Sequence, residues 1–463
     1  MKDTSKVTRR EAVAMAGAAT AAAVVAKKYI TEGPFIQKVK AANDQVQYAI
    51  IGTGGRGQYH IKHFNKLDSG RCVALCDIYD VNLQAALKAS KDKPVAIKDY
   101  RELLSRKDID AVVISTPLYM HYPVTRDALQ AGKHVFCEKS MVFKPEEVHG
   151  LRKLAEEHPK QVLQCGLQRR YSKFYQTAKQ MVEKGTIGRV THAYAQWHRN
   201  PGWTMKPDKD LKVQKERNWR LYRETSGGLV AELASHQIDV CDWMFNANPE
   251  FVVGVGDLTW LKDGRDVYDN VQLIFKYPKN QKLMYSTIST NKHLTLFNGQ
   301  RNEFGEVIMG TEGTIEITVG TDDEPAVGLW FYEPGPKLSA AELKKQVAAV
   351  AGATMASTGR GSRALPILFD KDTLSGKESF IEKEMKFARR WLYAKGVMVP
   401  EEDRNPCTVQ LDHFLECCRT GKKPLADVEI GLADSAMVIL ANLALDEGRR
   451  VYFNEMDKMG KKA

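Results

Sequence analysis

The chain has 463 residues, of which 43% are hydrophobic, so it is long and apolar enough to bury a core in each of two domains. Its formal net charge of +11 comes from 68 Lys and Arg residues against 57 Asp and Glu residues. These charges form no dense basic tract interleaved with aromatic residues, which argues against nucleic acid as a partner. The composition fits a soluble enzyme.

Residues 1–43 are predicted to form an export signal and a linker. Arg9 and Arg10 precede an alanine-rich, weakly apolar run from Ala12 to Ala26, which is too short and too small-sided to predict a membrane span. The pattern resembles a twin-arginine signal, although Ala12 stands where that signal usually has a large hydrophobic residue. We therefore expect the protein in the periplasm or cell envelope, with no membrane contact beyond this segment.

A glycine-rich turn follows the first predicted strand. The motif Gly52-Thr53-Gly54-Gly55-Arg56-Gly57 comes directly after the apolar run 48–51, and Asp77 closes the next apolar run, 72–76. Between a strand and a helix, this spacing indicates a dinucleotide site, because the glycines allow a tight turn and a close approach to a pyrophosphate at the helix N-terminus. Asp77 would bind both ribose hydroxyls and repel the additional phosphate of NADP, which favours NAD. We assign these seven residues to cofactor binding.

Strands continue to alternate with helices as far as residue 165. Residues 111–115 and 134–137 are apolar runs typical of buried strands, with a helical stretch between them. This order predicts an α/β Rossmann domain with a parallel sheet over residues 44–165. Ligands of such sheets lie beyond the carboxyl ends of the strands. We therefore add Thr116, Pro117, Glu138 and Lys139 to the cofactor-binding residues.

An ordered set of motifs resembles the Gfo/Idh/MocA oxidoreductases over most of residues 44–455. Two departures stand out: Ser140 replaces the usual proline after the Glu-Lys pair, and Glu232 replaces the usual aspartate. The motifs are Thr116-Pro117 with His121, residues 131–139, residues 166–171, Gly227-Gly228 leading to Glu232 and His236, residues 304–306 and 310–314, and residues 421–424. The resemblance also implies that His121 lies at the cofactor.

The resemblance implies a second, substrate-binding domain over residues 166–455, an α+β fold with an open, mainly antiparallel sheet. Its expected strands are 188–198, 251–257, 271–276, 283–289 and 304–318, and its last helices lie within 404–450. Residues 333–400 are expected to be an insertion, and residues 456–463 a basic tail. Pairing of sheet faces, by analogy with the family, predicts a homo-oligomer.

Three residues carry the expected chemistry: Lys139, Glu232 and His236. Glu232 and His236 are four apart on a predicted helix, so they share a face. His236 can take a hydroxyl proton as hydride leaves, and the Lys139 ammonium can stabilise the developing alkoxide. Glu232 would orient His236 or bind a neighbouring sugar hydroxyl.

Further residues are candidate sugar contacts, each of which could equally lie in the core or on the surface. They are Arg170, Tyr171, Trp197, Arg199 and Asp239. The chemistry requires no metal, and we expect none.

The sequence thus predicts an exported NAD-dependent oxidoreductase that acts on a secondary alcohol of a sugar, glycoside or cyclitol and holds its NAD tightly. One alternative is an NAD-dependent glycoside hydrolase that works by transient C3 oxidation, elimination, water addition and re-reduction. Another is an NAD-bound binding protein without turnover.

Overall fold

The computed structural model describes residues 45–199, 209–290, 294–297, 300–302, 304–318, 327–332, 363–367 and 404–459. The predicted signal lies outside the described residues, as does most of the predicted insertion. Within the described part of the chain there are a six-stranded sheet, a nine-stranded sheet and a two-stranded hairpin.

The six-stranded sheet is parallel throughout, and its strand order is β3-β2-β1-β4-β5-β6. All four residues of the central strand β4 are buried, as is typical of a sheet covered on both faces. The order reverses direction between β1 and β4, where α/β sheets bind their ligands. The strands are β1 (Val46–Ile51), β2 (Gly70–Cys76), β3 (Val95–Ile97), β4 (Ala111–Ile114), β5 (His134–Cys137) and β6 (Leu163–Cys165).

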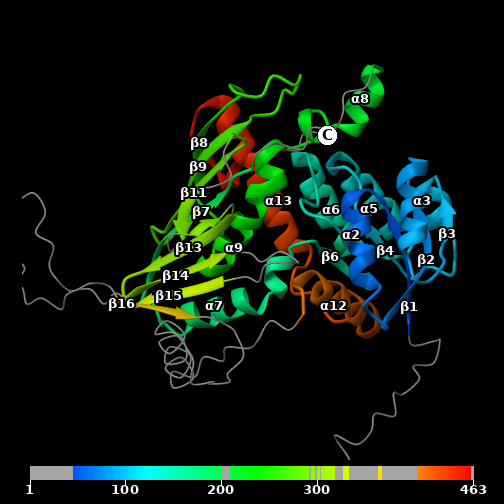
Figure 1. Ribbon diagram of the computed structural model, residues 1–463, viewed down its shortest axis with the longest axis horizontal. Helices are drawn as coiled ribbons and strands as arrows, with labels where there is room; N and C mark the ends of the chain where they lie inside the picture. Colours follow the sequence, from blue (N-terminus) through cyan, green and yellow to red (C-terminus); the bar gives the residue numbers. More distant parts are fainter. Residues whose placement is uncertain are drawn as a thin grey trace, which may run out of the picture. The chain divides into compact units, whose positions relative to one another are not determined.

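Five helices connect these strands (Figure 1). They are α2 (Gly55–Phe64), α3 (Asp80–Ala89), α4 (Tyr100–Leu104), α5 (His121–Gln130) and α6 (Pro145–Glu157). Helix α6 begins with Pro145 in its first turn, where the missing N–H costs nothing. Strand, helix and strand alternate as predicted, and the Rossmann architecture is confirmed.

The nine-stranded sheet is mainly antiparallel, which confirms the predicted second architecture. Its order is β16-β15-β14-β13-β7-β10-β9-β8-β17, and β7 and β10 form its parallel pair. Its strands are β7 (Val190–Trp197), β8 (Phe251–Asp257), β9 (Asn270–Lys276), β10 (Lys282–Ile288), β13 (Phe304–Gly310), β14 (Gly313–Thr318), β15 (Val327–Tyr332), β16 (Arg363–Ile367) and β17 (Val451–Tyr452); β11 (Leu294–Phe297) and β12 (Gln300–Asn302) form the hairpin. Strand β16 is the described part of the predicted insertion.

Alternation along the strands gives this sheet one buried face. In β9, Val271, Leu273 and Phe275 are buried, whereas Ile274 between them is 46% exposed. The buried face packs against helices, among them α9 (Ser235–Phe245) and α13 (Val428–Glu447). Among the described residues of this part, the other α-helices are α7 (Lys173–Glu183), α8 (Leu211–Arg217) and α12 (Pro406–Thr420).

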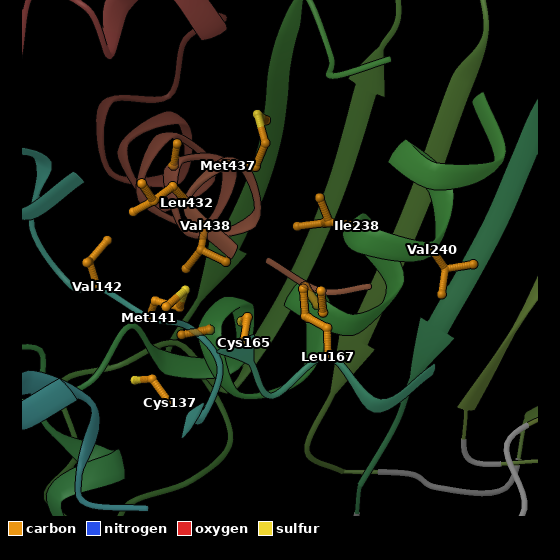
Figure 2. Packing of buried hydrophobic residues seen from close by; sticks show 14 of the residues in the cluster. Cys137, Met141, Val142, Cys165, Leu167, Ile238, Val240, Leu432, Met437 and Val438 are labelled. Atoms are coloured by element: carbon orange, nitrogen blue, oxygen red, sulfur yellow. The ribbon is translucent and has the colours of Figure 1, made fainter. Parts of the chain in front are cut away.

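Helix α13 is the central core helix. Figure 2 shows Leu432 and Val438 of this helix packed near Met141 and Cys165, which come from the loop after β5 and from β6. The helix has the length and the mean hydropathy, 1.7, of a membrane span, but 61% of that stretch is buried inside the fold. It also contacts β8, so it joins the core of the Rossmann sheet to that of the second sheet.

Candidate active site

The glycine-rich turn between β1 and α2 is shaped as a cradle. Gly52 has φ +88°, and a Cβ there would lie 2.7 Å from the carbonyl oxygen of Ser115. A Cβ on Gly57 would lie 2.1 Å from the carbonyl oxygen of Gly52. Beside Gly55, by contrast, there is nothing within 4 Å, and the space beside Gly54 is limited only by Asn82 at 3.7 Å. The turn is therefore closely packed on the side of Gly52 and Gly57 and open on the side of Gly54 and Gly55.

This open side fits a dinucleotide pyrophosphate. Helix α2 begins after Gly54 without a side-chain cap, so its first N–H groups are available to an anion. At the adjacent end of β4, the hydroxyls of Ser115 and Thr116 are buried without a hydrogen-bond partner in the described structure. Pro117 follows Thr116 and precedes a single 3₁₀ turn. These residues would hold NAD when it is bound.

Asp77 lies at the end of β2 and is 8% exposed. Its Oδ2 accepts hydrogen bonds from the backbone N–H of Thr53 at 2.8 Å and from the Thr53 hydroxyl at 3.1 Å, and Oδ1 accepts one from the N–H of Tyr79 at 2.8 Å. The carboxylate is thereby fixed beside the glycine-rich turn, as ribose recognition requires. Thr53 supports Asp77, a role that sequence reasoning did not give it.

Arg56 points inward. Its Nε donates to Oε1 of Glu138 at 2.7 Å, and the ring Nε2 of His60 lies 2.8 Å from the same oxygen. Burial raises the pKa of Glu138, but Arg56 and His60 outweigh burial and hold that pKa far below its usual range. Glu138 is therefore an anion that links the glycine-rich turn to the end of β5. Arg56 and Glu138 thus support the cofactor site by binding each other.

His121 joins two neighbouring strand ends. Its Nδ1 lies 2.7 Å from the carbonyl oxygen of Ser140, and its Nε2 lies 3.0 Å from that of Thr116. Both ring nitrogens thus face backbone oxygens and His121 is 3% exposed, so we assign it to holding the loop rather than to direct cofactor contact. The Lys139–Ser140 peptide bond in this loop is cis.

Lys139 reaches across to the second domain. Its Nζ donates to the carbonyl oxygens of Ala231 at 2.9 Å and Glu232 at 2.7 Å. These carbonyls belong to a π-helical turn, Val230–Ala234, that leads directly into α9. Burial lowers the pKa of Lys139, whereas Glu232, Glu138 and Asp434 act in the opposite direction. The lysine is thus a partly desolvated, anchored cation.

Glu232 forms an ion pair with Arg220. Its Oε2 accepts a hydrogen bond from Nε of Arg220 at 2.7 Å. Burial raises the pKa of Glu232, but Arg220 and Lys139 outweigh burial and hold it below its ordinary value. Glu232 lies in the π turn, where the sequence predicted a regular α-helix.

His236 is a neutral imidazole at ordinary pH. Burial, reinforced by the nearby charges of Lys139 and Arg169, lowers its pKa well below 6.5. Its Nδ1 is buried with no partner among the described residues. The ring lies 5.7 Å from that of Trp197 between centroids, and Trp197 stacks on Phe304 at 4.5 Å. A base and an aromatic face therefore lie beside the anchored lysine.

The remaining substrate candidates separate into three places. Arg199 lies just past β7, where its backbone N–H donates to the carbonyl of Ile288 at 2.9 Å. Tyr171 is 2% exposed in the core, so it is not a sugar contact. Arg170 and Asp239 bind each other, with Nε to Oδ1 at 2.8 Å, and line a cavity that Lys139 does not border. Nothing in the sequence around Arg170 and Asp239 indicated that the two residues bind each other.

Sequence reasoning missed a buried ion pair behind Trp197. Arg169 pairs with Glu306, and the hydroxyl of Tyr175 donates to the same carboxylate at 2.5 Å. The Arg169 guanidinium lies 5.6 Å from the Trp197 ring. Both Arg169 and Glu306 lie in motifs that resemble the family, residues 166–171 and 304–306, but nothing in the sequence indicated that they pair. Within the described ranges, no group of three or more His, Cys, Asp or Glu could hold a metal ion.

Comparison with known families identifies both parts of the chain. Residues 46–166 match the GFO_IDH_MocA model, described as an oxidoreductase family with an NAD-binding Rossmann fold, and residues 175–316 match the GFO/IDH/MocA C-terminal domain. Together these matches cover more than half of the sequence.

Individual relatives cover less. "Glycosyl hydrolase family 109 protein 2" of Shewanella sp. (strain ANA-3) is 33% identical over 35% of this chain and 37% of its own length. "Uncharacterized oxidoreductase YrbE" of Bacillus subtilis is 28% identical over 46% of this chain and 57% of its own length. These alignments thus leave much of each relative unmatched.

Solved structures share the fold over most of the chain. The aldose-aldose oxidoreductase from Caulobacter crescentus complexed with glycerol has a TM-score of 0.63 at 19% identity and covers 88% of this chain and 99% of its own. Levoglucosan dehydrogenase in complex with NADH and levoglucosan has a TM-score of 0.64 at 18% identity, with coverage of 88% and 99%. At these identities the likeness is one of fold.

Proposed function

Because the chain belongs to the Gfo/Idh/MocA oxidoreductase family and contains its NAD-binding domain, we propose that it oxidises a secondary alcohol of a sugar, glycoside or cyclitol. The observation that carries this proposal is the meeting of Lys139, His236 and Trp197 at the carboxyl edge of the parallel sheet. A cation, a neutral base and an aromatic surface are the groups that carbohydrate dehydrogenation requires.

The roles follow from the protonation states. Bound NAD supplies the hydride acceptor. The neutral imidazole of His236 accepts the hydroxyl proton, because its pKa lies well below its ordinary value. The Lys139 ammonium, which the carbonyls of Ala231 and Glu232 hold in place, stabilises the negative charge that develops on the reacting oxygen.

Two further groups suit a polyhydroxylated substrate. Trp197 could contact a pyranose ring with the part of its surface that Phe304 and Arg169 leave uncovered. The Arg220–Glu232 ion pair offers donors and acceptors to neighbouring hydroxyls, and the Arg220 side chain is 35% exposed. The names of two structural neighbours, an aldose-aldose oxidoreductase and a levoglucosan dehydrogenase, support a carbohydrate substrate.

The test is to incubate the purified protein with a panel of free sugars, glycosides and cyclitols and to follow the near-ultraviolet absorbance of reduced nicotinamide. A stable increase with one substrate, reversed by an added keto-sugar, is the expected result. No absorbance change with any member of the panel would contradict the proposal.

A second candidate is a glycoside hydrolase that oxidises and re-reduces its substrate within one turnover. The 33% identity to a protein named as glycosyl hydrolase family 109 favours it. Such an enzyme would release the aglycone of an aryl glycoside without net redox change and would incorporate solvent deuterium at C2. We favour the dehydrogenase because Lys139 and His236 account for hydride and hydroxyl-proton transfer, whereas no residue has been assigned to remove the C2 proton.

We also propose that the enzyme is exported and retains NAD through its catalytic cycle. The support is the Arg9-Arg10 pair before an alanine-rich run. Replacing both by lysine should move the protein from the periplasmic fraction to the cytoplasm. An unchanged distribution would exclude a twin-arginine route.

We further propose that the protein forms a homo-oligomer. The outward face of the nine-stranded sheet carries a row of side chains in register, Val253, Ile274, Met284 and Tyr194, of which Ile274 and Met284 are 46% and 39% exposed. Contiguous apolar surface of this kind is typical of protein interfaces. We infer that a second copy of the chain covers it.

A further inference from the structure

Asp434 is a buried carboxyl group that the proposed mechanism does not use. It lies on α13, is 1% exposed, and neither of its carboxylate oxygens has a hydrogen-bond partner in the described structure. A buried ionisable group without a partner is costly, so its presence calls for a physical explanation. It is also the one charged residue in the stretch Ile430–Leu440, whose other residues are apolar except for Ser435.

Asp434 borders a cavity of about 440 Å³ between α6, α9 and α13. Asp239 and Asp242 also line it, but Arg170 binds the first, and the hydroxyl of Tyr277 donates to the second at 2.7 Å. Of these three carboxyl groups, Asp434 is therefore the one without a described partner. None of the expected catalytic residues lines this cavity.

Helix α13 also packs against the loop that carries Lys139. The hydroxyl of Ser435, the next residue, accepts a hydrogen bond from the N–H of Met141 at 3.0 Å. Farther along the helix, the side-chain amide of Asn442 donates to the carbonyl of Gly227 at 3.0 Å, just before the π turn that binds the lysine. The helix thus contacts both segments that position Lys139, and the charges of Asp434 and Lys139 interact.

We propose that Asp434 is a positioning residue that sets the charge of Lys139 from the side of the cavity. As a carboxylate it stabilises the ammonium, together with Glu232 and Glu138, and against the opposing charge of Arg220. When a proton from the cavity binds a carboxylate oxygen of Asp434, an O–H bond forms, the negative charge is lost, and the ammonium loses one of its stabilising anions. The catalytic effect, though not the electrostatic one, rests on the proposed function.

The surroundings of Asp434 allow it to change charge. Burial, with the nearby carboxylate of Asp239, raises its pKa well above 3.8, and Asp242 acts in the same direction. Lys139 and Arg170 oppose that rise. Asp434 and Lys139 therefore titrate as a pair, and the proton balance of one depends on the other.

The experiment measures the charge of Lys139 directly. The full chain is labelled with acetic anhydride at a series of pH values, and modification of Lys139 is quantified by peptide mass spectrometry alongside the pH profile of turnover. In Asp434→Asn the labelling midpoint should fall by about one pH unit, because an anion that stabilises the ammonium is removed. The alkaline limb of turnover should move in the same direction.

Matched variants separate the possible outcomes. Asp434→Glu should restore the wild-type midpoint, and Glu429→Gln, which alters an exposed carboxylate on the rim of the same cavity, should leave it unchanged. If Asp434→Asn does not fold by circular dichroism, Asp434→Ser takes its place. An unchanged midpoint in a folded, neutral variant overturns the proposal. A shifted midpoint in an enzyme whose turnover does not need Lys139 supports it and refutes the proposed function instead.

Discussion

At the residue scale, burial gives Lys139 and His236 their chemistry. Both lose water on folding, which disfavours their charged forms and lowers the pKa of each. Nearby carboxylates oppose the fall in the pKa of Lys139 and favour its charged form, whereas Lys139 and Arg169 lower the pKa of His236 further and favour its neutral form. Neighbouring charges thus sort two buried bases into a cation and a proton acceptor.

The first prediction concerns these two residues. Lys139→Ala and His236→Ala should each lower turnover about a hundredfold or more, because acid–base and electrostatic assistance are lost. Bound NAD should be retained in both, as measured by nucleotide content after denaturation. In the wild type, the acid limb of turnover should lie well below pH 6.5, since His236 accepts a proton only above its lowered pKa. An acid limb at the ordinary histidine pKa would exclude His236 as the base.

The second prediction concerns Asp77. The wild-type protein should release mainly NAD or NADH on denaturation. Asp77→Ala should weaken NAD binding and reduce the preference over NADP, because the carboxylate that would repel the additional phosphate is gone. Titration of both nucleotides by fluorescence measures this. Thr53→Val is the matched control: it removes only a hydroxyl that supports Asp77, so it should weaken NAD binding less and keep the preference. Equal NADP affinity in the wild type and Asp77→Ala would contradict the role.

The sequence predicted residues whose position follows from a local motif. Asp77 and the glycines could be found because a strand, a turn and a helix are contiguous in the chain. The Arg169–Glu306 pair and the proximity of Asp434 to Lys139 could not, since the residues in each case are separated by more than a hundred positions in the sequence. A single carboxylate within the apolar stretch of α13 was the available signal for Asp434, and it had no meaning until that helix was placed beside Lys139.

At the element scale, the turn between β1 and α2 depends on a close backbone approach. Gly57→Ala would place a Cβ 2.1 Å from the Gly52 carbonyl oxygen, and a backbone atom cannot move aside as a side chain can. We expect a loss of about 2 kcal/mol or more in the free energy of unfolding, measured in urea, together with loss of bound NAD.

Gly55→Ala is the control for that substitution. It lies in the same turn at the first position of α2, with nothing within 4 Å of its Cβ, so its free energy of unfolding should change little. Equal stability of the two variants would show that the turn relaxes more easily than its packing indicates.

Strands were easier to predict than the helix at the reaction centre. The buried strands β4 and β5 and the alternating strand β9 have patterns that follow directly from their burial. The segment from Gly228 has the pattern of a regular helix, and the π turn within it leaves no mark in residue order. The turn is linked to tertiary structure, because Nζ of Lys139 donates to two of its carbonyls.

At the scale of the whole molecule, the nine-stranded sheet has a helix-covered face and an outward face. Ile274→Asp or Met284→Asp would place a charge in the apolar row of the outward face. Each should lower the molar mass of the assembly, measured by light scattering during size-exclusion chromatography. Val81→Asp, at a site on α3 that is 75% exposed, is the control and should leave the mass unchanged. A monomeric wild type would refute the inferred self-association.

The order of the two architectures was predictable. In the first part, apolar strands alternate with helices, and both parts contain motifs that resemble the family. How α13 joins them was not. Its residues belong to the second domain in sequence, yet its side chains pack against Met141 and Cys165 of the first part (Figure 2). Only contacts between distant segments could show that this helix belongs to both cores.

The π turn has one further consequence, which concerns helical phase. A π turn holds one more residue than an α turn, and each residue of a helix advances it by about 100°. Deleting Leu233 would therefore allow a regular helix in which His236 keeps its phase, because the additional residue and the widened turn are removed together. The carbonyls at positions 231 and 232 would then point along the helix and would no longer bind Lys139 as they do now. No catalytic side chain would be changed, yet turnover should fall towards the level of Lys139→Ala while NAD stays bound. The reaction centre thus depends on the number of residues in this segment as well as on their identity.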